Sequence, residues 1–191
     1  MKNKPRLGDL KTSEGVLVQG DKEKADLLNK YFASVYTQEK LENQPSLESK
    51  YDGPPLSKPV ITADTASKKL LKLNVNKAKG PDGLHPRVLR ETAASITQPL
   101  CAIFQKSIDS SCLPTSWKTG NITPIHKKGR RTAVGNYRPV SLTSVVGKLM
   151  ESLVRDHLVE HMMRNKLFCD AQHGFVPGRS CMTKLLVVIE L

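Results

Sequence analysis

Residues 117–142, WKTGNITPIHKKGRRTAVGNYRPVSL, predict a β-hairpin with a basic tip, and the rest of the chain is organised around it. Ile122 and Ile125 lie in the first arm, and Tyr137, Val140 and Leu142 mark the second. The segment between the arms, KKGRRTAVGN, has a glycine near each end, which allows the chain to bend. We therefore expect two antiparallel strands in this part of the chain.

This hairpin concentrates the positive charge of the chain. Its cations are Lys127, Lys128, Arg130, Arg131 and Arg138, and no Asp or Glu occurs from residue 110 to residue 150. That acid-free window holds seven Lys or Arg, so it supplies +7 of the formal net charge of +12. Such a segregated charge favours a strongly negative partner, and nucleic-acid phosphates are the natural candidate. A solvated charged loop is the alternative for KKGRR taken alone.

The composition is that of a folded globular protein, since 38% of the 191 residues are hydrophobic and 25% are charged. This length allows one or two domains. No long uncharged apolar run could span a bilayer, and MKNKPRLGDLKTSEG lacks the apolar core of a signal peptide. The four cysteines form no CxxC pair, and no His lies at zinc-finger spacing from them. We therefore expect an intracellular protein, of the cytoplasm and nucleus, with no membrane segment and no structural metal.

Helices are predicted on both sides of the hairpin, which makes the fold class α+β, mostly helical with a basic β-hairpin. VLVQGD near the start is a candidate strand, and the prolines of residues 38–60 make that stretch the best candidate linker. We expect a division into residues 1–60, an upstream extension and linker with one amphipathic helix, and residues 61–191. Apolar spacing predicts helices over residues 22–36, 62–73, 86–94, 96–110 and 144–165, and a further helix begins near residue 180.

Several residues are expected to fix the ends of these elements. Asp21, Thr62 and Ser144 precede apolar-periodic runs, as N-cap residues do. Pro86 suits the first position of a helix, because its missing N–H has no intrahelical partner there. Trp117 is expected to pack beneath the base of the hairpin.

Two histidines of the 144–165 helix, His157 and His161, are spaced i, i+4 and in principle suit a metal ion. No third ligand accompanies them, and the HExxH pattern does not occur there. We therefore expect helix-surface or partly buried histidines and assign no metal ligand.

The run LLVVIEL, residues 185–191, is apolar on several faces of a helix at once. Such a segment should be buried. Because the sequence offers nothing further to cover it, we expect either that the polypeptide is cut in mid-domain or that another chain is its partner.

Four blocks in order resemble the reverse transcriptase of jockey-like non-LTR retrotransposons, which are long interspersed elements. The resemblance is closest over residues 76–191, and it extends more weakly upstream through EKADLLNKYFASVYT. The blocks are GPDGLHP at 80–86, LPTSWKTGNITPIHKKG at 113–129, NYRPVSLTSVVGKLMESLV at 136–154 and QHGFVPGRS at 172–180.

The resemblance implies part of a right-hand polymerase, an RNA-directed DNA polymerase whose partners are an RNA template, a DNA primer and incoming dNTP. Residues 61–191 would correspond to the fingers, truncated before the palm and thumb. Lys127 matches the basic position of the PIxKKG block, and Arg138 matches the arginine of the YRPxS block. The resemblance implies that these two contact the nucleotide phosphates.

The resemblance also implies that a further set of residues lies at or near the nucleic acid. Lys128, Arg130 and Arg131 would touch template phosphates or solvent, while Gln172 and Arg179 match a block that lies near the template in the family. Val176 and Pro177 stand where basic residues are common in the family.

The metal-binding aspartates of the family are absent from this sequence, so no catalytic residue and no metal ligand is assigned. In such polymerases a palm strand and an xxDD turn supply carboxylates for two metal ions, and Mg²⁺ is expected for the intact enzyme. We expect this polypeptide to be inactive alone. Two alternatives are a non-catalytic basic module that binds RNA or DNA, and a degenerate remnant of an element.

Overall fold

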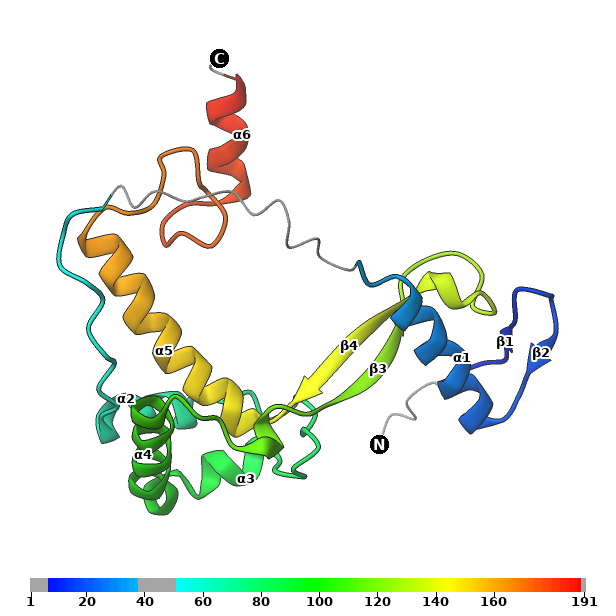
Figure 1. Cartoon of the computed structure of the whole chain (residues 1–191), viewed down its shortest axis with the longest axis horizontal. Coiled ribbons are helices and arrows are strands. Elements are labelled where there is room, and N and C mark those ends of the chain that lie inside the picture. The colour runs from blue at the N-terminus through cyan, green and yellow to red at the C-terminus, as the bar shows by residue number, and fades with distance from the viewer. Residues whose placement is uncertain (1–6, 38–50, 190–191) are drawn as a thin grey trace.

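The computed structural model describes residues 7–37 and 51–189, with side chains up to residue 185. A long β-hairpin joins two groups of elements that lie at its opposite ends (Figure 1). The hairpin consists of β3 (Gly120–His126) and β4 (Tyr137–Thr143), which pair in antiparallel fashion. The predicted hairpin and the predicted α+β class are thus confirmed.

The larger group, here called the helical lobe, lies at the base of the hairpin. Phe104 and Leu70 are fully buried in its core, and Trp117 packs edge-on against Phe104 with ring centroids 5.8 Å apart. Burying a side chain of this size contributes roughly 1.5–3 kcal/mol. The lobe contains α2 (Ala63–Leu71), α3 (Pro86–Glu91), α4 (Ala93–Ser110), the 3-10 turn η2 (Thr115–Trp117) and α5 (Val145–Arg164).

The caps predicted for two of these helices are present. The Thr62 side chain accepts a hydrogen bond from the backbone N–H of Thr65 at 3.3 Å, at the start of α2. Ser144 is fully buried and accepts one from the backbone N–H of Gly147 at 3.1 Å, at the start of α5. Pro86 occupies the first position of α3, as predicted. These bonds satisfy backbone donors that a helix start otherwise leaves unpaired.

The smaller group, here called the N-terminal lobe, lies at the tip of the hairpin. It consists of β1 (Leu10–Lys11), β2 (Leu17–Val18), α1 (Asp21–Ser34) and the 3-10 turn η3 (Val134–Asn136). Leu10, Leu28 and Phe32 form a buried cluster together with Tyr137, which comes from β4 of the hairpin. The upstream segment therefore packs directly on the hairpin, and the division of the chain near residue 60 stays a prediction.

Backbone contacts also join the N-terminal lobe to the hairpin tip. The N–H of Lys11 donates to the carbonyl oxygen of Thr132 at 2.7 Å, and the Tyr137 hydroxyl donates to that of Arg131 at 2.7 Å. The side chain of Lys24 is buried, where it pairs with Asp9 at 3.3 Å. These contacts hold the basic tip in a defined position on the N-terminal lobe.

The two faces of the hairpin differ because neighbouring strand residues point to opposite sides. Tyr137, Pro139 and Ser141 share one face of β4, which we call the helix-facing face, because Tyr137 lies in the core with α1. Arg138, Val140 and Leu142 share the other, which we call the free face. Their partners across the ladder are Ile125, Thr123 and Asn121.

Some sequence expectations were wrong in detail. Asp21 is the first residue of α1, Gly20 is the N-cap, and no side-chain bond caps this helix. The helix predicted over residues 22–36 ends at Ser34, so Val35 lies past its end and is 57% exposed. The 86–94 helix ends at Glu91, and α4 begins at Ala93 rather than at residue 96.

Further along the chain, the candidate strand VLVQGD is shortened to the two residues of β2. Leu158 of α5 is 42% exposed, since the last turns of that helix extend beyond the lobe's core. The final helix, α6 (Cys181–Ile189), is present, while most side chains of the apolar 185–191 run lie outside the described residues.

Neither described range of the chain contains a helix with the length and hydropathy needed to cross a bilayer.

Candidate nucleic-acid interface

The tip of the hairpin has an ordered backbone and exposed cationic side chains. The Lys127 N–H donates to the Asn136 carbonyl oxygen at 2.8 Å, and the Asn136 side-chain amide donates to the Arg130 carbonyl oxygen at 2.9 Å. Gly129 turns the chain with φ of +77°, a conformation that favours glycine. The side chains of Lys127, Lys128, Arg130 and Arg131 are all exposed.

Arg138 and Lys127 lie on the same side of the hairpin. Arg138 pairs with Ile125 across the ladder, and both are exposed on the free face. Lys127 lies two residues beyond Ile125, and its bond to Asn136 continues the ladder by one step. The alternation of side chains therefore makes Lys127 and Arg138 diagonal neighbours, within about 7–8 Å of each other at the backbone.

The cations of the hairpin are not neutralised within the described chain. None of its described carboxylates forms an ion pair with Lys127, Lys128, Arg130, Arg131 or Arg138. A fixed group of exposed cations without internal partners attracts polyanions, and the attraction falls with ionic strength.

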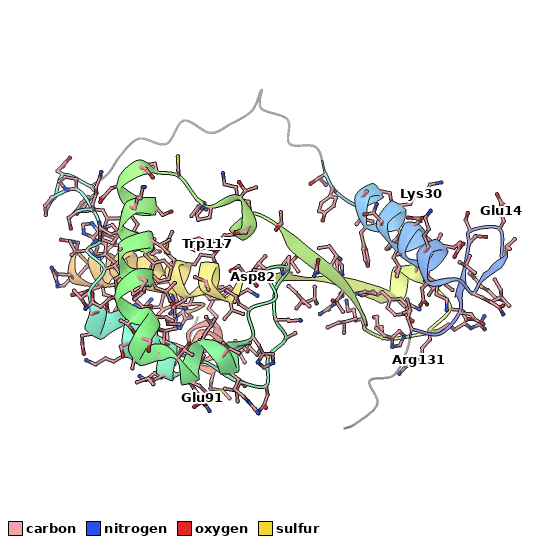
Figure 2. All side chains as sticks on the ribbon, turned by 90° about the horizontal axis from the view of Figure 1, so that it is seen from below. Glu14, Lys30, Asp82, Glu91, Trp117 and Arg131 are labelled. Atoms are coloured by element: carbon pink, nitrogen blue, oxygen red, sulfur yellow. The ribbon has the colours of Figure 1, made fainter. Side chains whose placement is uncertain are left out.

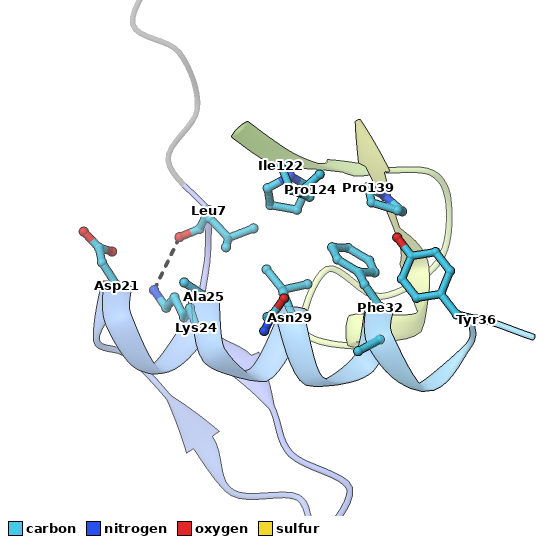
Figure 3. Close-up of a pocket in the computed structure, with 12 residues that line it drawn as sticks. Leu7, Asp21, Lys24, Ala25, Asn29, Phe32, Tyr36, Ile122, Pro124 and Pro139 are labelled. Atoms are coloured by element: carbon cyan, nitrogen blue, oxygen red, sulfur yellow. Dashed lines mark hydrogen bonds between the residues drawn. The ribbon is translucent and has the colours of Figure 1, made fainter. Parts of the chain in front are cut away.

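The helix-facing face of the hairpin has a different character. Phe32 and Tyr36 of the α1 end face Pro124 and Pro139 across a pocket of about 380 Å³ (Figure 3). At the mouth of this pocket Lys24 donates to the Leu7 carbonyl oxygen at 3.4 Å. This side of the hairpin is mainly apolar. One face of the hairpin therefore packs against the N-terminal lobe, while the other presents exposed cations.

The QHGFVPGRS loop, residues 172–180, uses its arginine internally. One guanidinium nitrogen of Arg179 donates to the carbonyl oxygens of Cys169, Asp170 and Gln172, at 3.1, 2.8 and 2.6 Å. The Gln172 side chain donates to the Gly174 carbonyl oxygen at 3.3 Å. Arg179 therefore fixes the shape of this loop.

The structure does not bring all the sequence-predicted residues together. Lys127, Lys128, Arg130, Arg131 and Arg138 share the far half of the hairpin, beside the N-terminal lobe. Gln172 and Arg179 belong to the loop between α5 and α6, at the opposite side of the molecule (Figure 1).

Sequence reasoning missed a second group of cations on the helical lobe. Lys69, Lys72, Lys77 and Lys148 line one groove between α2, the loop that follows it, and α5. The lysines of α2 were visible as the polar side of an amphipathic helix, and Lys77 as a neighbour of a turn. Their meeting with Lys148 depends on how α2 packs on α5, which no local pattern reveals.

Among the described residues, no group of three or more His, Cys, Asp or Glu side chains lies close enough together to hold a metal ion. His157 contacts the Ser57 carbonyl oxygen through its Nε2 at 2.8 Å.

The chain is similar to part of several curated polymerases. The RNA-directed DNA polymerase from mobile element jockey of Drosophila melanogaster is 35% identical over 122 residues, 63% of this chain and 13% of the relative. The probable RNA-directed DNA polymerase from transposon BS of the same fly is 27% identical over 158 residues, 81% of this chain and 17% of the relative. The chain thus spans less than a fifth of the length of these relatives. No family model matches it.

A third relative is the probable RNA-directed DNA polymerase from transposon X-element of Drosophila melanogaster, 28% identical over 116 residues. That match covers 60% of this chain and 13% of the relative. These similarities confirm the resemblance to the reverse transcriptases of jockey-like and other non-LTR retrotransposons.

Proposed function

We propose that these residues form the fingers part of a non-LTR retrotransposon reverse transcriptase, which binds template RNA and the phosphates of incoming dNTP. The observation that carries the proposal is the separation of the hairpin faces. One face packs on the N-terminal lobe through Tyr137, and the other presents Arg138 and Lys127 without an internal acid.

The chemistry of nucleotidyl transfer suits these two side chains. The primer 3′-hydroxyl attacks the α-phosphorus of the dNTP, and the bond from that phosphorus to pyrophosphate breaks. Negative charge accumulates on the leaving pyrophosphate, and a planar guanidinium can donate to two of its oxygens at once. In the proposal Arg138 meets the leaving phosphates and Lys127 adds a point charge beside it.

The remaining cations of the tip are assigned to the RNA. Lys128, Arg130 and Arg131 are exposed next to Lys127, so they would meet template phosphates. The internal bonds of Arg179 support a positioning role, in which it holds the 172–180 loop, and Gln172 with it, in shape near the template.

Polymerisation itself is assigned to residues outside this sequence. The two metal ions of such enzymes need paired carboxylates, and the described residues offer no suitable group. For the intact enzyme we expect Mg²⁺, a DNA primer, and a palm and thumb that hold them.

The proposal is tested by RNA binding to the 191-residue chain. Lys128→Ala with Arg130→Ala, two of the exposed cations assigned to the template, should weaken the binding of a single-stranded RNA and reduce its salt slope by about 1.4, since each neutralised phosphate contributes about 0.7. The control, Lys22→Ala with Lys30→Ala, removes the same charge from exposed positions of α1 and should leave the affinity nearly unchanged. Equal losses in both variants would contradict the proposal.

A second experiment concerns catalysis. Primer extension on an RNA template, with Mg²⁺ and dNTP, should give no product from these residues alone. Extension above the blank that disappears in Arg138→Ala would show that the chemistry lies within this chain and would overturn the assignment.

A further inference from the structure

A groove on the helical lobe combines apolar walls with a basic rim. Its volume is about 500 Å³, and Leu73, Leu142, Val145 and Leu149 are among its lining residues. Lys69 and Lys72 come from α2 and its C-cap, Lys77 from the loop that follows, and Lys148 from the first turn of α5. No carboxylate of the described residues lines it.

Three of the four lysines are available for an external anion. Lys72, Lys77 and Lys148 are exposed, and no ion pair joins them to an acid of the described residues. Lys69 is half-buried and pairs with Asp156 at 2.5 Å, and Arg155 pairs with the same carboxylate at 2.7 Å. Of the four groove lysines, only Lys69 therefore pairs with Asp156, and the other three form no ion pair with a described carboxylate.

The groove continues the free face of the hairpin. Leu142 lines the groove, and it shares its face of β4 with Val140 and Arg138. Four residues of extended strand separate Arg138 from Leu142, a distance of about 14 Å at roughly 3.4 Å per residue. One extended nucleic-acid strand of a few nucleotides can cover that distance.

From this continuity we propose that the groove of Lys72, Lys77 and Lys148 is a second phosphate-binding site, which holds the backbone of a single-stranded RNA whose adjoining nucleotides lie on the free face of the hairpin. The apolar walls suit the sugar and base surfaces, and Asn74 and Ser152 add polar side chains to the lining. The choice of RNA as the polyanion rests on the proposed function. The site itself rests on the lysines and on the shared face.

The test compares two variants of equal charge. Lys72→Gln, Lys77→Gln and Lys148→Gln together remove the groove cations, while Lys22→Gln, Lys30→Gln and Lys106→Gln remove three exposed lysines elsewhere. Circular dichroism verifies that both variants are folded. The probe is a labelled single-stranded RNA of about 15 nucleotides, titrated by fluorescence anisotropy at several salt concentrations.

The groove variant should lose about 2 units of salt slope, because three phosphate contacts at about 0.7 each are removed. At 0.1 M salt this corresponds to a loss in affinity on the order of 10- to 100-fold. The control variant should lose much less. Asp156→Asn should bind RNA more tightly than wild type, since it releases Lys69 toward the groove.

Unchanged RNA affinity in the groove variant, or equal losses in the groove and control variants, would overturn the inference. The same measurements distinguish a failure of this inference from a failure of the proposed function. A loss in the groove variant with none in the Lys128→Ala and Arg130→Ala variant would keep the groove and remove the assignment of the hairpin tip to RNA, and the reverse pattern would do the opposite.

Discussion

Replacing Gly80 with alanine should destabilise the junction between the hairpin and the helical lobe. Gly80 opens the GPDG turn and is buried. A Cβ at this position would lie 2.6 Å from the carbonyl oxygen of Thr143, 2.7 Å from the carbonyl carbon, and 2.8 Å from the Ser144 nitrogen. Thr143 is the last residue of β4 and Ser144 is the N-cap of α5, so the turn packs where the hairpin meets the long helix.

The loss of stability in Gly80→Ala can be estimated from the backbone atoms that the added Cβ would displace. All three atoms belong to backbone that is held on both sides, by the ladder pair Thr143–Gly120 and by the Ser144 cap. Overpacking of this kind costs about 1–3 kcal/mol. Since 1 kcal/mol lowers the melting temperature of a chain of this length by about 2–4 °C, a cost of about 2 kcal/mol corresponds to about 4–8 °C.

The clash can be separated from backbone strain within the same turn. Gly80 has no positive φ, and the following proline favours extended backbone there, so alanine fits the conformation. Gly83 is the opposite case, with φ of +72° and nothing within 4 Å of an added Cβ. Gly83→Ala should cost about 1–2 kcal/mol, and Gly83→Asn should recover part of it because asparagine tolerates left-handed backbone.

Thermal melts followed by far-ultraviolet circular dichroism measure these effects. Gly8→Ala is the matched control, because its φ is not positive and an added Cβ meets nothing within 4 Å. The expected order of melting temperature is wild type equal to Gly8→Ala, then Gly83→Asn, then Gly83→Ala, with Gly80→Ala lowest or equal to Gly83→Ala. A Gly80→Ala protein that melts within 1 °C of wild type would refute the close contact on which this reasoning depends.

Three further outcomes are expected. Ser144→Ala should cost about 1 kcal/mol in thermal melts, because α5 loses its side-chain cap. Cys101 should react with Ellman's reagent only after denaturation, since burial raises the pKa of its thiol, whereas the other three cysteines are exposed and should react in the native protein. Burial acts to raise the pKa of Asp156, but hydrogen bonds from Lys69 and Arg155 lower it overall. The ionised Asp156 stabilises the fold at pH values above the pKa that this carboxyl has in the unfolded chain, and the stabilisation is lost as the pH falls through its pKa in the folded protein. Between pH 7 and pH 3 the melting temperature of Asp156→Asn should therefore fall less than that of wild type.

Local patterns sufficed for the elements whose ends are fixed by their own residues. The hairpin follows from strand-forming arms around a glycine-containing basic loop. The starts of α2 and α5 follow from Thr62 and Ser144, whose side chains cap the helix that each precedes. The break between α3 and α4 was predicted near residue 95 but lies at Thr92, whose hydroxyl donates to the Val88 carbonyl oxygen within a region of continuous helical spacing.

Contacts between distant segments could not be predicted in this way. The sequence alone reveals the basic residues of the hairpin, but the face of the hairpin that each one occupies depends on the strand register. The N-terminal lobe packs on the hairpin because Tyr137 completes a cluster with Leu28 and Phe32, which lie more than a hundred residues earlier in the sequence. The groove likewise depends on the meeting of Lys69 with Asp156 across α2 and α5.

The register on which the candidate site depends is fixed by two prolines. Pro124 and Pro139 lie opposite each other. Because Lys127 donates to Asn136, the alternation of an antiparallel ladder makes the proline pair one that exchanges no N–H bonds, so neither missing N–H is needed. A slip of one residue would turn one strand over and place a proline where the ladder needs a donor. The same slip would move Tyr137 out of the core and point Arg138 at α1. The prolines therefore favour the register in which Tyr137 lies in the core and the adjacent Arg138 stays exposed on the free face.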